Sequence, residues 1–323
     1  MQEIEEMLNF YERWPDIYEP VSISSDTLIE PKKEIIACGY GASLIPILIA
    51  KEFYNKNNIA IYTNGNYPSE NDRGKNFVAV SHSGDTYECL ESVKKALKFS
   101  LNVYVITGGG NLLQFSEKNS LFTIKINRAK TSRLGFPYIM SGLIPLFDKF
   151  FEVNVNNEII KYFSALKSQS NLLKEKASKL AEFFNNGEIV AIYFSNNTKP
   201  FALRLRYLLS ENAKVHSIYE NIMEVAHNGI SAWDKKMQIP IILLRSALDD
   251  ETTKERFDII NEVLSSLNYN VLQLEVKSRE EIISTLFTID LSTIYLAKLK
   301  NENPFETKVQ EAVRNKIKEK HFS

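Results

Sequence analysis

The feature that most constrains the fold is a regular alternation of short apolar runs with longer segments of helical period. The runs follow a first amphipathic helix that ends near Trp14, and they are rich in β-branched residues. Such alternation is typical of parallel strands joined by helices. We expect strands at 34–38, 59–63, 77–81, 103–107 and 121–126, and helices at 42–53, 86–99 and 136–151. This first series predicts a doubly wound α/β domain.

A second series of the same kind follows a polar, turn-rich stretch at 153–157. We expect a long charged helix from 158 to about 184, then strands at 189–194, 214–217, 239–244 and 271–276, with helices at 199–209, 252–267 and 280–299. A length of 323 residues suits two domains. We therefore predict two doubly wound parallel-sheet domains of similar, five-stranded topology with a cleft between them. The first spans 1–153 with the leading helix, and the second spans 154–323 with a C-terminal helix.

The charge balance excludes several classes of partner. Lysine and arginine total 39 against 40 acidic residues, so we expect neither nucleic acid nor a membrane surface as a partner. Cys38 and Cys89 have no metal-ligand spacing and suit a reducing cytoplasm, where both would be buried small side chains. Residues 1–6 carry glutamates where a secretory signal has basic residues, and the longest apolar run, 44–50, is too short to cross a bilayer. We expect a soluble, cytoplasmic protein.

The stretch Gly39-Tyr40-Gly41-Ala42-Ser43 stands between the first expected strand and its helix. Glycines at this point let the backbone approach a ligand, as they do in dinucleotide sites. A third glycine is missing and no acid ends the next strand, which disfavours NAD. An ordinary strand-to-helix turn stays open as the alternative.

A second candidate loop, Ser81-His82-Ser83-Gly84-Asp85-Thr86, lies between the third expected strand and a helix. The hydroxyls cluster at a helix N-terminus, where unpaired amides and the positive end of the helix dipole favour an anion. A hydroxyl or Asp85 could instead simply cap the helix. Because ligands of open α/β sheets bind at the carboxyl ends of strands, Ser43 and this loop should lie together, and a phosphate would fit there.

These loops resemble the sugar isomerase (SIS) domain, whose strand, Ser-x-Ser-Gly-x-Thr loop and helix hold a sugar phosphate. More narrowly, the chain is similar to the archaeal-type bifunctional phosphoglucose/phosphomannose isomerases over residues 39–314. Arg133 stands in a loop like that family's Pro-Arg-Ala-Ala, and Glu211 begins a Glu-Asn-Ala-Lys stretch like its Glu-Asn-Ser-Lys. His227-Asn228 resembles its Asn-His-Asn-Glu motif at the expected distance from Glu211.

The C-terminal helix also resembles that family, through Asn303-Pro304 followed by Thr307 and Arg314. Four positions depart from the family pattern: a lysine is replaced by Arg314, a glutamate by Gly229, an asparagine by Asp85 and a proline by Ser132. The change to Arg314 matters most, because a planar guanidinium does not occupy the place of a compact ammonium.

The resemblance implies an aldose–ketose isomerase that interconverts glucose 6-phosphate, and mannose 6-phosphate, with fructose 6-phosphate through an enediol, a step of glycolysis and gluconeogenesis. It implies a homodimer in which His227 reaches the other subunit's active site, and it implies no metal and no cofactor. The resemblance implies that the substrate's phosphate is bound by Gly41, Ser43, Ser81, Ser83 and Thr86. It implies proton transfer by Glu211 and stabilisation of the enediolate by Arg133. It also implies ring opening by His227 with Arg314, and a side chain at Thr307 that is small enough to leave space for either epimer.

Two other functions stay open. A non-catalytic sugar-phosphate-binding SIS protein would keep the serines and need neither Glu211 nor His227. The other is another SIS-type sugar-phosphate enzyme: either a different sugar-phosphate isomerase or an aminotransferring enzyme, which would need a lysine for imine formation and an ammonia-producing domain that we do not expect here. Taken singly, a histidine is more often a satisfied hydrogen bonder than an acid or base, and we expect that for His82, His216 and His321.

Overall fold

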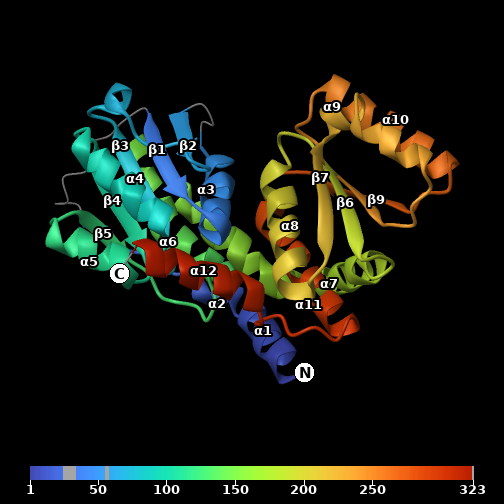
Figure 1. Ribbon diagram of the computed structural model, residues 1–323, viewed down its shortest axis with the longest axis horizontal. Helices are drawn as coiled ribbons and strands as arrows, with labels where there is room; N and C mark the ends of the chain where they lie inside the picture. Colours follow the sequence, from blue (N-terminus) through green and yellow to red (C-terminus); the bar gives the residue numbers. More distant parts are fainter. Residues whose placement is uncertain (25–33, 55–57, 322–323) are drawn as a thin grey trace. The chain divides into compact units, whose positions relative to one another are not determined.

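The structure is a computed structural model that describes residues 1–24, 34–54 and 58–321 (Figure 1). The chain forms two compact units, each built on one parallel sheet. The five-stranded unit comprises Trp14–Lys161 and Thr307–Ser323, and the four-stranded unit comprises Met1–Arg13 and Tyr162–Glu306. This division differs from the predicted ranges 1–153 and 154–323, because the segments at the two ends of the chain each belong to the unit built from the other half of the sequence.

The sheet of the five-stranded unit has the order β2-β1-β3-β4-β5, and every neighbouring pair is parallel. The central strands β1 and β3 are buried throughout, as expected for apolar strands covered on both faces. The predicted parallel α/β fold is therefore confirmed. The strands are β1 (Ile35–Gly39), β2 (Ile59–Tyr62), β3 (Asn76–Ser81), β4 (Asn102–Thr107) and β5 (Phe122–Lys125).

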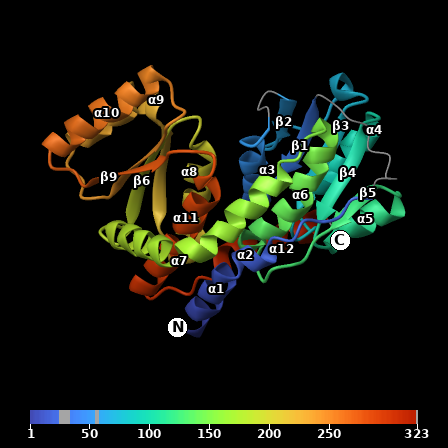
Figure 2. The same cartoon turned by 180° about the vertical axis from the view of Figure 1, so that it is seen from behind.

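Helices cover both faces of this sheet (Figures 1 and 2). On one face α4 (Tyr87–Lys98) and α5 (Gly110–Lys118) form a core with alternate residues of β1, β3 and β4, including Cys38 and Cys89. On the other face lie α3 (Leu44–Lys51) and α6 (Phe136–Phe151), which pack against each other. The unit also contains α2 (Trp14–Ile17) and α12 (Lys308–His321).

The four-stranded unit repeats this topology with one strand fewer. Its parallel strands are β6 (Ile189–Phe194), β7 (His216–Asn221), β8 (Ile241–Ser246) and β9 (Val271–Val276), in the order β7-β6-β8-β9. The order matches β2-β1-β3-β4, so the predicted similarity of topology is confirmed. The fifth strand predicted for this half is absent from the described sheet, because only residues 277–280 separate β9 from the next long helix.

The helices of this unit include a long apolar one, α11 (Glu281–Leu299), which is long and apolar enough to cross a membrane by length and composition alone. Most of α11 is buried, and it packs against α8 (Lys199–Ala213) and α1 (Gln2–Glu12), as a core helix does. The other helices are α9 (Ile222–Val225), α10 (Glu251–Ser266) and α7 (Asn156–Phe184), of which the part from Tyr162 onward belongs to this unit.

The predicted boundary between α8 and β7 is wrong by several residues. The sequence predicts that the helix ends at 209 and that the strand covers 214–217, whereas α8 runs to Ala213 and β7 covers His216–Asn221. The polar residues after 209 resemble a loop. In the structure the buried Asn212 side chain donates a hydrogen bond to Thr293 Oγ1 at 2.9 Å, and this internal partner keeps the last turn helical.

Candidate active site

The two predicted phosphate-binding loops lie together at the carboxyl edge of the five-stranded sheet. The backbone N–H of His82 donates to Ser43 Oγ at 3.1 Å, which joins the loop after β1 to the loop after β3. Ser81 Oγ accepts a hydrogen bond from Gly84 N at 3.1 Å and donates to Thr86 Oγ1 at 3.3 Å. Ser43 and Ser81 are buried, and Ser83 and Thr86 are partly exposed. We call Ser43 with residues 81–86 the hydroxyl cradle.

Gly84 gives the cradle its shape. Its φ is +74°, and a Cβ at this position would lie 1.6 Å from the carbonyl oxygen of Gly109, so no other residue fits without moving the backbone. The Gly84 carbonyl accepts from Leu112 N at 2.9 Å. The Asp85 carboxylate accepts from the backbone N and from the side chain of Asn111 at the start of α5. The cradle is therefore held rigidly by the loop between β4 and α5.

Capping of helix α4 does not explain all of the cradle hydroxyls. Helix α4 has 12 residues, and Thr86 is its N-cap residue without a side-chain capping bond. Ser83 Oγ accepts from the nearby Asp85 N at 3.2 Å, which is a local turn. The capping alternative therefore does not account for Thr86, and amides at a helix N-terminus with hydroxyls beside them suit an oxyanion.

His82 connects the cradle to the segment that carries Arg133. Its Nε2 accepts a hydrogen bond from Ala129 N at 3.0 Å, and a Cβ at Gly135 would lie 2.2 Å from its ring. Burial, with a smaller contribution from Arg128, lowers the pKa of His82 to about 4. The ring is thus a neutral hydrogen bonder, as predicted. Arg133 is buried in η4 (Ser132–Gly135), which packs against η1 (Gly41–Ser43).

Glu211 and His227 belong to the four-stranded unit. Glu211 is partly buried near the end of α8, where Lys214 Nζ donates to its carbonyl oxygen at 2.7 Å. His227 is exposed in the turn after α9. Strand β7 lies between the two positions, with Glu211 before its first residue and His227 after its last. Six residues of strand span roughly 17 Å, so the two side chains lie at opposite ends of β7.

Thr307 and Arg314 belong to the five-stranded unit with the cradle. Thr307 directly precedes α12, and its hydroxyl donates to Glu311 Oε1 at 3.0 Å. Arg314 is exposed on α12. Gly41 begins η1 with a φ of +53° and with open space where a side chain would stand. The structure thus joins Gly41, the cradle hydroxyls and Arg133 in one region, and it places Glu211 and His227 on the other unit.

Sequence reasoning missed the third loop of this region, Thr107-Gly108-Gly109-Gly110 after β4. A Cβ at Gly110 would lie 2.6 Å from both the Asp85 carboxylate and the Ser83 carbonyl oxygen, so this loop packs directly against the cradle. Three successive glycines directly after a strand are the signal that could have revealed it. Within residues 1–24, 34–54 and 58–321, no group of three or more His, Cys, Asp or Glu side chains is placed to hold a metal ion.

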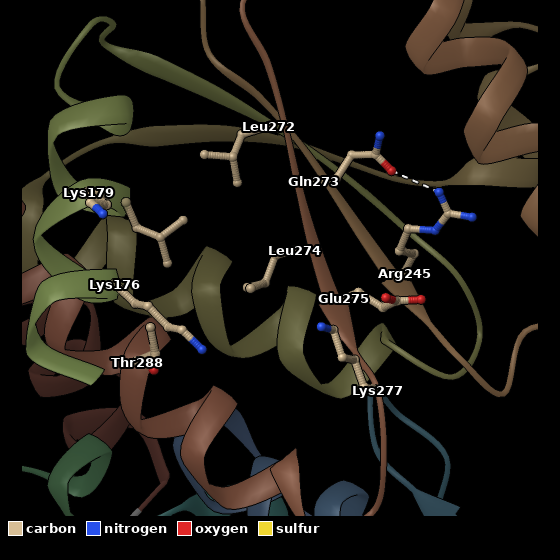
Figure 3. Close-up of a pocket in the computed structure, with 10 residues that line it drawn as sticks. Lys176, Lys179, Arg245, Leu272, Gln273, Leu274, Glu275, Lys277 and Thr288 are labelled. Carbon is tan, nitrogen blue, oxygen red and sulfur yellow. Dashed lines mark hydrogen bonds between the residues drawn. The ribbon is translucent and has the colours of Figure 1, made fainter. Parts of the chain in front are cut away.

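A groove of about 660 Å³ runs along β9, one of the two edge strands of the four-stranded sheet (Figure 3). Leu272 and Leu274 point toward α7, whereas Gln273 points toward Arg245, which donates to it at 2.8 Å. Side chains from both faces of β9 line this groove, so it follows the unpaired edge of the sheet. The predicted site residues are not among those that line it.

Comparison with known proteins agrees with this architecture. A family model described as the bacterial phospho-glucose isomerase C-terminal SIS domain matches residues 173–317. D-glucosamine-6-phosphate 4-epimerase of Sulfolobus acidocaldarius is 25% identical over 315 residues, which are 96% of this chain and 97% of that protein. Bifunctional phosphoglucose/phosphomannose isomerase of Thermoplasma volcanium is 25% identical over 290 residues, which are 88% of this chain and 91% of that protein.

A solved structure extends the likeness to the fold. Tagatose-6-phosphate ketose/aldose isomerase from Escherichia coli superposes with a TM-score of 0.62 at 14% identity, covering 94% of this chain and 93% of that one. At that identity the likeness concerns the fold. The chain is therefore similar to SIS-domain proteins: residues 173–317 match the bacterial phospho-glucose isomerase C-terminal SIS domain, and most of its length is similar to a bifunctional phosphoglucose/phosphomannose isomerase.

Proposed function

We propose that this protein interconverts glucose 6-phosphate, and mannose 6-phosphate, with fructose 6-phosphate. The observation that carries the proposal is the hydroxyl cradle, because Ser43, Ser81, Ser83 and Thr86 converge at the N-terminus of α4 in a rigid loop. A phosphate is the group that these sugars share, and it would bind there. Binding energy at the phosphate end then positions the reacting carbons, which lie at the other end of the sugar.

The chemistry transfers one proton between carbon 2 and carbon 1 of the open-chain sugar. We assign the transfer to the Glu211 carboxylate, a suitable base for this step. The negative oxygen of the enediolate is stabilised by Arg133, a buried guanidinium that stays charged throughout. His227, with Arg314, opens the ring by moving a proton between the ring oxygen and the hydroxyl at carbon 1. Thr307 is short enough to leave room for either epimer at carbon 2.

The position of His227 supports assembly of the site from two subunits. Glu211 and His227 lie at opposite ends of β7, so one chain does not bring both to one sugar. In a homodimer, His227 of one chain completes the site that contains Glu211 of the other. Mixed dimers of inactive Glu211→Gln and inactive His227→Ala chains should therefore regain part of the activity. A monomeric protein with full activity would rule out this assembly.

The test of the main proposal is turnover of each sugar phosphate. Fructose 6-phosphate formed from glucose 6-phosphate and from mannose 6-phosphate is measured side by side, and we expect comparable rates. Thr307→Gln should shift the ratio toward glucose 6-phosphate by filling the space near carbon 2. Absence of turnover of both sugars by a folded protein that still binds phosphate would overturn the proposal and favour a non-catalytic sugar-phosphate-binding role.

A second candidate is epimerisation of glucosamine 6-phosphate at carbon 4. The Sulfolobus acidocaldarius D-glucosamine-6-phosphate 4-epimerase matches almost the whole chain, and Arg314 departs from the lysine expected of the isomerases. Both activities would use the same phosphate site. Incubation with glucosamine 6-phosphate, followed by NMR of the hydrogen at carbon 4, distinguishes them, because the isomerase leaves that carbon unchanged.

A further inference from the structure

The hydroxyl cradle contains no cation of its own. Besides the His82 ring, which accepts from Ala129 N, its neutral polar groups are the hydroxyls of Ser43, Ser81, Ser83 and Thr86 and the backbone amides. The nearest charge within the loop is the carboxylate of Asp85, which has the wrong sign. A phosphate monoester carries nearly two negative charges at neutral pH, and the helix dipole supplies the equivalent of only about half a positive charge. A neighbouring cation would balance the ligand.

Arg128 lies beside the cradle. It follows β5, and its aliphatic part covers Gly108, where a Cβ would lie 2.7 Å from Arg128 Cγ. Its Nη1 would lie 3.6 Å from a Cβ atom at Gly109. The carbonyl oxygen of Gly109 is the atom that a Cβ at Gly84 would meet. The guanidinium therefore lies beside Gly109, and Gly109 in turn lies directly against Gly84 of the cradle. The lowered pKa of His82 agrees, because Arg128 contributes to it.

Two further features fit a ligand-binding role. Arg128 is exposed, and no ion pair joins it to a carboxylate among the described residues. Gly108, whose φ is not positive, needs to be glycine because a Cβ there would meet the Arg128 side chain and the His82 carbonyl oxygen at 2.6 Å. The Arg128 side chain therefore lies along Gly108 and Gly109 of the loop after β4, close to the cradle.

We propose that Arg128 is a further substrate-binding residue, whose guanidinium pairs with the phosphate held by the hydroxyl cradle. The assignment rests on the proposed function for its substrate, a sugar phosphate. Arginine suits this role because its planar fork can donate two parallel hydrogen bonds to phosphate oxygens. It is distinct from Arg133, which is buried in η4 and is assigned to the reacting end of the sugar.

Inorganic phosphate is the probe for a direct binding test by calorimetry. Arg128→Met keeps the aliphatic part over Gly108 and removes the charge, so we expect its Kd for phosphate to rise about ten-fold or more. Arg128→Lys should restore part of the affinity. Lys118→Met is the matched control, because Lys118 is an exposed cation in the last turn of α5, at the opposite edge of the sheet, and its Kd should stay within about two-fold.

Kinetics and NMR complete the test. Arg128→Met should raise KM for the sugar phosphate while kcat stays within a few-fold, because the contact is made equally before and during the reaction. It should also raise the pKa of His82, which shows the guanidinium at this loop with no ligand present. Unchanged phosphate binding in a folded, active Arg128→Met protein would overturn the inference alone. Weakened phosphate binding without turnover in the wild type would overturn the proposed function and leave the inference standing.

Discussion

The loops at the carboxyl edges of the two sheets differ in one decisive respect. By strand order, β3 corresponds to β8 and β1 to β6. In the five-stranded unit the loops after β1 and β3 are joined by a hydroxyl, where Ser43 accepts from His82 N. In the four-stranded unit the equivalent loops are joined by a buried carboxylate, where Asp249 accepts from Asn197 Nδ2 at 2.9 Å and from Ser246 N at 2.8 Å.

The exchange of a hydroxyl for a carboxylate suggests different roles for the equivalent loops of the two units, which we call the division of work. Asp249 brings a negative charge to the position between the two loops that the Ser43 hydroxyl occupies in the other unit, so an additional anion is disfavoured there. In the function that we propose, the five-stranded unit uses its hydroxyls and amides for the ligand. The four-stranded unit would supply Glu211 and His227, which are not part of this loop.

Glu211→Gln should give the largest effect and separates the two roles. The amide keeps the shape and loses the ability to accept a proton, so we expect kcat to fall by about 10²–10⁴. Phosphate affinity should stay unchanged, because the cradle is in the other unit. Steady-state rates and calorimetry measure the two quantities, with exposed Glu255→Gln on α10 as the control. Activity within a few-fold of wild type would show that Glu211 is not the base.

Acid should weaken the five-stranded unit through His82. Its pKa is about 4 when folded and about 6.5 when unfolded, so below pH 6.5 the unfolded chain binds more protons. Stability is therefore complete above pH 6.5 and decreases as the pH falls toward 4, by roughly 3 kcal/mol in total. His82→Gln retains an acceptor for Ala129 N and removes the titration. Urea unfolding at pH 4.5 and 7 should show a smaller loss for this variant, and an equal loss would contradict the assignment.

Removing two cradle hydroxyls tests the ligand side of the comparison. Ser83→Ala with Thr86→Ala should raise KM for the sugar phosphate by about thirty-fold, since each of the two lost hydrogen bonds costs roughly 1 kcal/mol. The matched variant in the other unit is Ser246→Ala with Thr253→Ala, because the Ser246 hydroxyl donates to the Val276 carbonyl oxygen at the end of β9 and the Thr253 hydroxyl donates to Asp250. It should leave KM unchanged. Equal KM values for both double variants would refute the division of work.

The smallest effect is expected at Asp249. Asp249→Asn keeps an acceptor for Ser246 N and weakens a charge-assisted bond, so the free energy of unfolding should fall by about 1 kcal/mol. KM and phosphate affinity should not change. Denaturant titration and kinetics on the same preparation measure both, and an altered KM would place this loop in the active site after all.

Much of the fold could be predicted because strands and helices leave local patterns. Runs of Val and Ile marked β1 and β3, and parallel strands then required the loops after them to share an edge. The end of α8 was missed because Asn212 is stabilised by Thr293, far along the chain. Arg128 was missed for the same reason. No local sequence pattern distinguishes an exposed arginine after a strand, and its place beside the cradle follows from its contacts with Gly108 and Gly109.

The exchange of terminal segments between the units has a consequence for synthesis. Neither unit is a continuous stretch of chain, because α1 belongs with residues made much later and α12 belongs with residues made much earlier. Ile4, Met7 and Tyr11 are buried in the four-stranded unit, so during translation they lack their neighbours on α11 until the ribosome has passed residue 299. Domains usually fold one after another from the N-terminus as the chain emerges. Here the first helix meets its packing partner only after residues 281–299 have been made.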